Sequence, residues 1–212
     1  MHPYNLQGVS GLDADSAERK TGQFFEWLSL ALAPTLCGSK PSTILSLRDV
    51  RHLALLSIWR ECGCATLQTT ALRFKILRRL PSLETVLFYR SDLLEQCLAD
   101  DHHRWFLSSQ GYPVNEGVES CLAVLQERFR DCCPHEIGLL LGIPLKDVLG
   151  FMAMTDLPLT CRGEWCVYGD PAVSLAAMQR FEDDRSSVAC LLSSGMSPYE
   201  IIREKASDLH IA

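Results

Sequence analysis

The segment 132–151, CCPHEIGLLLGIPLKDVLGF, places two cysteines, a histidine and a glutamate directly before an apolar run. Residues of these types can bind a metal ion or carry out acid–base chemistry. The zinc-protease motif H-E-x-x-H requires a second histidine four residues after the first, so that both lie on one face of a helix. Position 139 is a leucine, so the segment lacks this motif.

A thiol–imidazole metal cluster would still be possible if the fold brought two distant segments together. Its ligands would come from Cys132, Cys133, His135, Cys161 and Cys166. Adjacent cysteines chelate one ion poorly, and zinc sites usually show two well-spaced pairs such as C-x-x-C, which this sequence lacks. We therefore predict no metal site and interpret the cysteines as small buried apolar residues. Metal or haem binding through His135 is the alternative.

The segment 33–47, APTLCGSKPSTILSL, contains a second candidate site. Its polar side chains Thr35, Ser39 and Lys40 could bind an anion in a loop. The segment has one glycine and matches neither a Walker A phosphate loop nor a dinucleotide-binding fingerprint. No G-x-S-x-G nucleophile elbow supports a catalytic triad. The alternative is an ordinary connection between a helix and a strand.

Charge and composition limit the classes of function. The 212 residues include 20 Lys and Arg against 26 Asp and Glu, a formal net charge of −6. This balance opposes sequence-independent binding of nucleic acid or of an anionic membrane surface. No apolar stretch approaches the roughly 18 residues of a membrane-spanning helix, and the opening residues lack a signal-peptide pattern. We expect a cytoplasmic protein with reduced cysteines, whose partner is a small molecule, another protein or a further copy of the chain.

Hydrophobic periodicity predicts mixed helices and short strands. Residues 1–14 show no periodicity and are expected to be a flexible terminus before a single domain over 15–212. Helices are expected over 15–33, from the possible capping box at Ser46 and Asp49 to residue 63, and over 92–98, 101–109, 116–130, 145–152, 171–193 and from 198 onward. Strands are expected over 43–47, 72–76, 85–90, 136–142 and 163–170, the second and third as an antiparallel hairpin. The predicted fold class is α+β, a mainly antiparallel sheet of about four to five short strands with helices packed on it.

Three motifs in this order resemble an uncharacterised bacterial family, the domain of unknown function DUF3793. They are APTLCGSKPSTILSL, CPHEIGLLLGIPLKDVLGF and GEWCVYGD, and the resemblance covers most of residues 24–195. It implies a single-domain cytoplasmic protein of the kind found mostly in anaerobic Firmicutes. The resemblance implies no particular activity, because the family has none assigned. The family pattern falls on Pro34, Thr35, Gly38, Lys40, Pro41, Pro134, His135, Glu136, Gly138, Gly142, Pro144, Asp147, Gly163, Trp165, Tyr168, Gly169 and Asp170. Cys166 stands where a lysine is usual, which weakens a metal or redox role for that cysteine.

The polar positions of this pattern lie at the ends of predicted elements, where sites are usually built. We expect Thr35, Lys40 and Tyr168 to bind a ligand. His135, Glu136 and Asp170 are the candidate catalytic residues. The leading hypothesis is a pocket near Lys40 and His135 that binds or transforms a small anionic molecule, with an unknown cofactor requirement.

Two structural alternatives remain at the same positions. Glu136 and His135 could satisfy buried backbone groups, and Asp170 could cap the helix after Pro171. A non-catalytic protein-interaction or regulatory module is the alternative function, and it predicts dispersed polar residues beside an exposed apolar patch.

Overall fold

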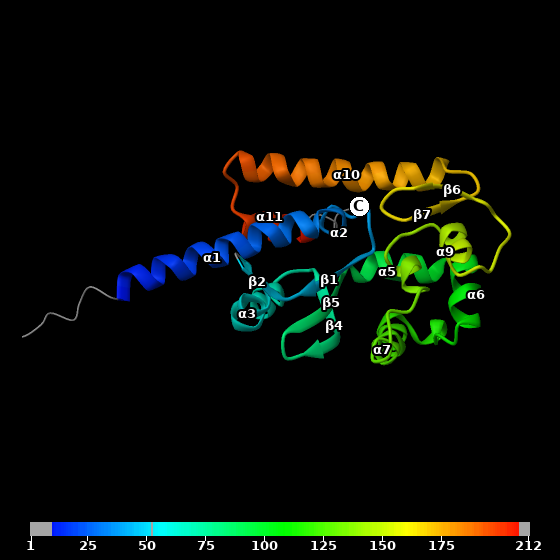
Figure 1. The fold of residues 1–212 in the computed structure, drawn as a ribbon, viewed down its shortest axis with the longest axis horizontal. Coiled ribbons are helices and arrows are strands. Elements are labelled where there is room, and N and C mark those ends of the chain that lie inside the picture. The colour runs from blue at the N-terminus through cyan, green and yellow to red at the C-terminus, as the bar shows by residue number, and fades with distance from the viewer. Residues whose placement is uncertain (1–9, 52, 208–212) are drawn as a thin grey trace, which may run out of the picture.

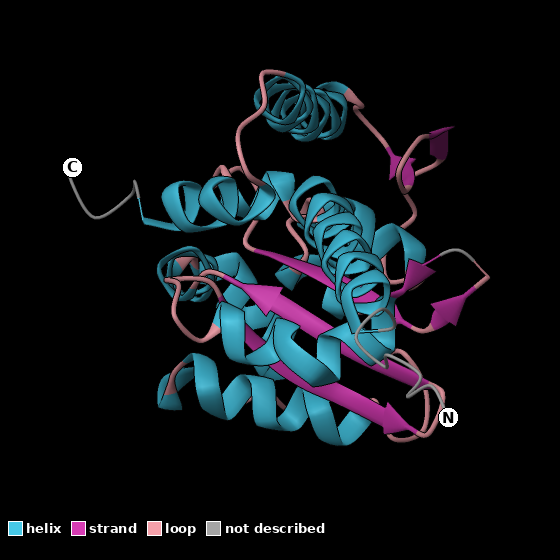
Figure 2. Cartoon of the chain, turned by 90° about the vertical axis from the view of Figure 1, so that its left-hand side faces the viewer, coloured by secondary structure: helices cyan, strands magenta, loops and turns pink. Residues whose placement is uncertain are grey.

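The computed structural model describes residues 10–51 and 53–207. Its central sheet has three antiparallel strands, β1 (Ser42–Leu47), β5 (Leu83–Tyr89) and β4 (Arg73–Leu80), in the order β1-β5-β4. Strands β4 and β5 form the predicted hairpin, in which Leu80 pairs with Leu83 across a two-residue turn. Helices cover both faces of this sheet (Figures 1 and 2). The fold class is therefore α+β.

The prediction of one sheet with four to five strands is wrong. Two further pairs of antiparallel strands stand apart from the central sheet: β2 (Asp49–Val50) with β3 (Leu53–Ala54), and β6 (Leu159–Arg162) with β7 (Cys166–Tyr168). The predicted strand over 163–170 finds its partner in the segment just before it. It cannot extend the central sheet because helices separate the two.

Five helices pack on one face of the central sheet. They are α5 (Ser91–Ala99), α6 (Asp101–Ser109), α7 (Val118–Arg128), α8 (Ile137–Leu140) and α9 (Leu145–Phe151), with the 3-10 turn η2 (Val114–Glu116) between α6 and α7. Leu87 and Tyr89 of β5 enter this first core together with Phe106, Leu122 and Leu139.

A second core lies on the opposite face. Here β5 contributes Val86 and Phe88, which pack with Phe24, Trp59 and Ile202. The surrounding helices are α1 (Ser10–Ala31), α2 (Ala33–Leu36), α3 (Leu55–Ile58), the π-helix η1 (Trp59–Gly63), α4 (Cys64–Leu67), α10 (Ala172–Ser193) and α11 (Pro198–Ser207). In Figure 1, α10 runs along one side of the molecule from the β6–β7 hairpin back past α2.

Segment 136–142 is not the strand that its apolar run suggests. Residues 137–140 form α8, and Gly142, with φ +79°, takes the left-handed conformation that ends it. The N–H of Gly142 donates to Leu139 O, and the N–H of Ile143 donates to Gly138 O, at 3.1 and 2.9 Å. This pair of bonds is the Schellman arrangement, in which a glycine terminates a helix. Gly142 is therefore the stop signal of α8.

The helix expected from Ser46 and Asp49 to residue 63 instead runs from Leu55 to Leu67, and Ser46 lies in β1. Most other helix boundaries agree closely with the sequence. Helix α6 has the predicted limits Asp101–Ser109, and α10 begins directly after Pro171. Helix α1 begins at Ser10, earlier than the expected start at 15, while residues 1–9 lie outside the described part of the chain. Asp49 does cap a helix, but across the short β2–β3 hairpin: its carboxylate accepts the N–H groups of Leu56 and Ser57 at 2.9 and 3.1 Å.

No helix in the described ranges is long and apolar enough to span a membrane.

Candidate functional site

Thr35 and Lys40, predicted to bind a ligand, lie in different surroundings. The Thr35 side chain is fully buried, and its hydroxyl shares a 2.8 Å hydrogen bond with the hydroxyl of Thr43. The Lys40 ammonium lies over the ring of Phe181, 5.4 Å from the ring centroid. Burial lowers the pKa of Lys40, while the charge of Glu164 opposes that effect. Thr35 therefore joins α2 to β1, and Lys40 packs against α10.

The side chains of Glu136 and its neighbour His135 also lie in different surroundings. Glu136 is buried, accepts a 3.1 Å hydrogen bond from the hydroxyl of Tyr112, and forms an ion pair with Arg128. The His135 side chain is exposed, and its ring meets that of Phe151 edge to face at 5.0 Å between centroids. Glu136 thus ties α7 and the loop before η2 to the start of α8, and His135 lies in different surroundings.

Asp170 and Tyr168 sit on either side of a turn with Gly169. The carboxylate of Asp170 accepts the N–H of Ala172 at 3.0 Å, as expected of a side chain at the start of α10. The ring of Tyr168 packs on Gly150 of α9. Its backbone N–H donates to Asp147, so β7 is attached to α9 rather than to a further strand.

Asp147 is a buried polar centre that belongs to the second motif but was not among the predicted site residues. Its carboxylate accepts from Lys146 Nζ at 2.7 Å, Trp165 Nε1 at 2.9 Å, the Tyr168 N–H at 2.8 Å and Ser174 Oγ at 2.5 Å. Burial alone would raise the pKa of Asp147, but these donors outweigh it and hold the pKa below its usual value. The second and third motifs therefore meet at an ionised carboxylate.

A small cavity lies beside this carboxylate, between α8, α9 and β7. Its volume is about 290 Å³. The walls are mostly apolar, and the lining includes Ile137, Gly138, Leu141, Val148, Phe151 and Trp165, with His135 among the few polar residues. We call this space the His135 cavity. A Cβ on Gly138 would approach Val148 to 3.1 Å, so a glycine there allows α8 to lie close against α9.

Two thiols accompany His135 at the same cavity. Cys133 and Cys166 both line it, so the fold does bring part of the proposed thiol–imidazole cluster together. Among the described residues, however, no group of three His, Cys, Asp or Glu side chains is placed to hold a metal ion. Burial raises the pKa of Cys133, which keeps that thiol protonated at neutral pH.

Arg162 does not line the cavity but contacts Cys166, which does. Its Nη1 lies 3.2 Å from Cys166 Sγ, and its side chain is exposed. No spacing in the sequence indicates Arg162, because its contact with Cys166 depends on β6 pairing with β7. Lys40 is not among the residues that line the cavity, so the fold does not place Lys40 and His135 around one ligand.

These features define an α+β protein with a small central sheet between two cores and an apolar cavity between α8, α9 and β7. Residues 28–202 match the family model described as "Protein of unknown function (DUF3793)". The chain belongs to this family, as its three motifs predicted. No curated protein and no solved structure matches it.

Proposed function

We propose that the protein binds a small amphipathic organic acid in the His135 cavity. The apolar part of the ligand lies between α8 and α9, and its carboxylate meets His135 and Arg162. The observation that carries the proposal is an apolar cavity lined by His135 and by Cys166, whose sulfur lies 3.2 Å from Nη1 of Arg162. Ligand sites generally combine apolar walls with a few polar groups that fix orientation.

The size and walls of the cavity support a small ligand. Its volume of about 290 Å³ is at the lower end of the range for small-molecule sites. The edge-to-face contact with Phe151 holds the imidazole of His135 at the mouth. A carboxylate there would replace water around His135 and Arg162 with charge-assisted hydrogen bonds.

Binding fits this geometry better than catalysis does. Asp147 is the carboxylate in the lining, and four donors already occupy its oxygens. A general base needs a free lone pair within reach of the proton that it removes. The protonated thiol of Cys133 is a poor nucleophile. The candidate catalytic roles of Glu136 and Asp170 would need them at this cavity, and neither lines it.

The test is isothermal titration calorimetry with hexanoate and, as its uncharged counterpart, hexanamide. Hexanoate is expected to bind at least tenfold more tightly than hexanamide. His135→Ala and Arg162→Gln should each weaken hexanoate binding about tenfold, the effect of one charge-assisted hydrogen bond of roughly 1.5 kcal/mol. Both side chains are exposed, so neither change should alter the unfolding midpoint by much.

The matched control is His102→Ala, which removes another exposed histidine, on α6 and away from the cavity. It should leave hexanoate binding unchanged. Equal affinity for hexanoate and hexanamide would show that the edge charges do not select an acid. Unaltered binding in His135→Ala would place the site elsewhere.

An exposed apolar surface favours a protein-interaction module as the second candidate function. It consists of Phe151, Met154, Leu157 and Leu159, which are 54%, 47%, 41% and 43% exposed. Sedimentation velocity distinguishes self-association from the monomer. A dimer that dissociates in Leu159→Arg would support this second function, and a monomer for the wild type would remove a further copy of the chain as the partner.

A further inference from the structure

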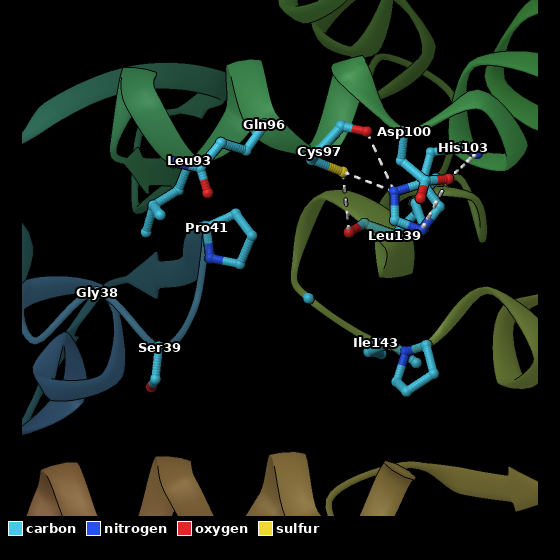
Figure 3. A pocket seen from close by; sticks show the side chains of 12 residues that line it. Gly38, Ser39, Pro41, Leu93, Gln96, Cys97, Asp100, His103, Leu139 and Ile143 are labelled. Atoms are coloured by element: carbon cyan, nitrogen blue, oxygen red, sulfur yellow. Dashed lines mark hydrogen bonds and ion pairs between the residues drawn. The ribbon is translucent and has the colours of Figure 1, made fainter.

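A second cavity lies between α5, the loop at residues 38–41 and the turn at residues 142–144. Its volume is about 430 Å³. Figure 3 shows Cys97 in the last turn of α5, Asp100 directly after this helix and His103 in the first turn of α6, with the Cys97 sulfur directed to Leu139. Ser39 lines the cavity from the loop at residues 38–41. We call it the Asp100 cavity. Its polar groups are of a different kind from those around His135.

Asp100 brings a negative charge to this cavity. Its Oδ1 accepts the N–H groups of His102 and His103 at 3.0 Å each. The hydrogen bond from His103 is the main cause of a lowered pKa, so the carboxylate is ionised at neutral pH. Among the described residues, no hydrogen-bond donor occupies its other oxygen, Oδ2, and the side chain is 48% exposed. That oxygen is free to accept from a ligand.

Cys97 and His103 form a pair that could be mistaken for a catalytic dyad. Their Sγ and Nδ1 atoms are 3.6 Å apart. Nδ1 is also 3.1 Å from the carbonyl oxygen of Cys97, and a carbonyl can only accept, so this nitrogen carries a hydrogen. Burial raises the pKa of Cys97 to about 12, and its thiol points to Leu139 O at 3.8 Å. The thiol is therefore neutral, and the pair orients the imidazole instead of activating sulfur.

The field in the cavity favours a cation. Asp100 lies between the carboxyl-terminal end of α5 and the amino-terminal end of α6, where the two helix dipoles oppose each other, so the Asp100 carboxylate sets the sign of the charge. Ser39 on the opposite wall hydrogen-bonds to the carboxylate of Asp184. Lys40, the basic residue of that loop, is directed to the ring of Phe181 and does not line the cavity. His103 is the one basic side chain in the lining, and its Nε2 lies 4.0 Å from Asp100 Oδ1.

We propose that the Asp100 cavity binds a small organic amine. The ammonium group donates to Asp100 Oδ2 and to the side-chain carbonyl of Gln96, and the methylene groups lie against Leu93, Leu139 and Ile143. The three apolar side chains and the two acceptors all belong to the lining of the same cavity. This inference does not depend on the proposed acid at His135.

Calorimetry with 1,4-diaminobutane tests the inference, with 1,4-butanediol as a ligand of the same length and no charge. The diamine should bind, and the diol should bind at least tenfold more weakly. Asp100→Asn should weaken diamine binding about tenfold or more, because the amide lacks the charge. The variant should still fold, since asparagine replaces aspartate well as the N-cap of α6.

Two controls separate the outcomes. Asp101→Asn changes the adjacent carboxylate, which does not line the cavity, and should leave diamine binding unchanged. His135→Ala should also leave it unchanged, so loss of acid binding and loss of amine binding are independent results. Equal binding of diamine and diol, or unaltered binding in Asp100→Asn, would overturn the inference. Binding of Mg²⁺ in place of the diamine would overturn it as well.

Discussion

At the scale of single residues, Asp147 differs from the exposed carboxylates because its charge is buried. Its side chain is completely buried, yet its pKa is lowered. An ionised carboxylate in such a place is stable only when donors replace its water, and Lys146, Ser174 and Trp165 do so. Asp147 therefore joins α9, β7 and α10 at one point.

Asp147→Asn should lower the free energy of unfolding by about 3 kcal/mol at pH 7, because it leaves the Lys146 charge without its partner. A group with a lowered pKa stabilises the folded state above its unfolded pKa of about 4, and loses that contribution as pH falls through the folded pKa. The wild type should therefore lose stability below about pH 4 more steeply than the variant. Urea denaturation from pH 2 to 7 measures both effects.

The matched control is Asp156→Asn, at an exposed carboxylate in the loop after α9. It should change stability by less than about 0.5 kcal/mol. An Asp147→Asn variant with wild-type stability and the same acid dependence would show that the buried carboxylate does not hold these elements together.

The sequence predicts the local part of the candidate site and misses its tertiary part. His135, predicted as a catalytic residue, lines the His135 cavity, and its catalytic role stays a prediction. Glu136 faces elsewhere, since consecutive residues of a helical turn point about 100° apart. Arg162 and Trp165 reach the site only because β7 is bound to Asp147. No spacing in the sequence specifies that contact.

At the scale of elements, periodicity identifies hairpins and long helices but not the short apolar run at 136–142. Charged and apolar residues alternate along β4 from Arg73 to Ile76, so a period of two residues fits this strand. The run at 136–142 is apolar throughout, and both a strand and a buried helix satisfy it. Gly142 decides between them through its positive φ, which depends on the path of the chain towards α9.

Close contact between α9 and β7 gives a prediction at this scale. A Cβ on Gly150 would lie 2.3 Å from the ring of Tyr168, so Gly150→Ala should lower the free energy of unfolding by about 1–3 kcal/mol. Gly22→Ala is the counterpart in α1, where no atom lies within 4 Å of the added carbon. It should instead raise stability by about 0.5–1 kcal/mol. Thermal denaturation followed by circular dichroism compares the two, and equal effects would contradict the close contact.

At the scale of the whole molecule, β5 lies between the two cores. Successive residues of a strand point to opposite faces, so Val86 and Phe88 enter one core while Leu87 and Tyr89 enter the other. The second core also needs both ends of the described chain, because Phe24 of α1 and Ile202 of α11 pack in it together. Displacement of β5 would therefore remove side chains from both cores at once.

If residues 15–212 form a single domain, as the sequence predicts, the whole chain should unfold cooperatively. Urea unfolding should show one transition, with coincident midpoints by circular dichroism and tryptophan fluorescence. Leu122→Ala in the first core and Leu28→Ala in the second, both fully buried, should each lower the stability of the whole chain by about 2–5 kcal/mol. Both variants should keep one transition, because β5 transmits the loss from either core to the other. A biphasic curve in either variant would mean that the faces of the sheet unfold separately, and that the chain holds two units that share a strand.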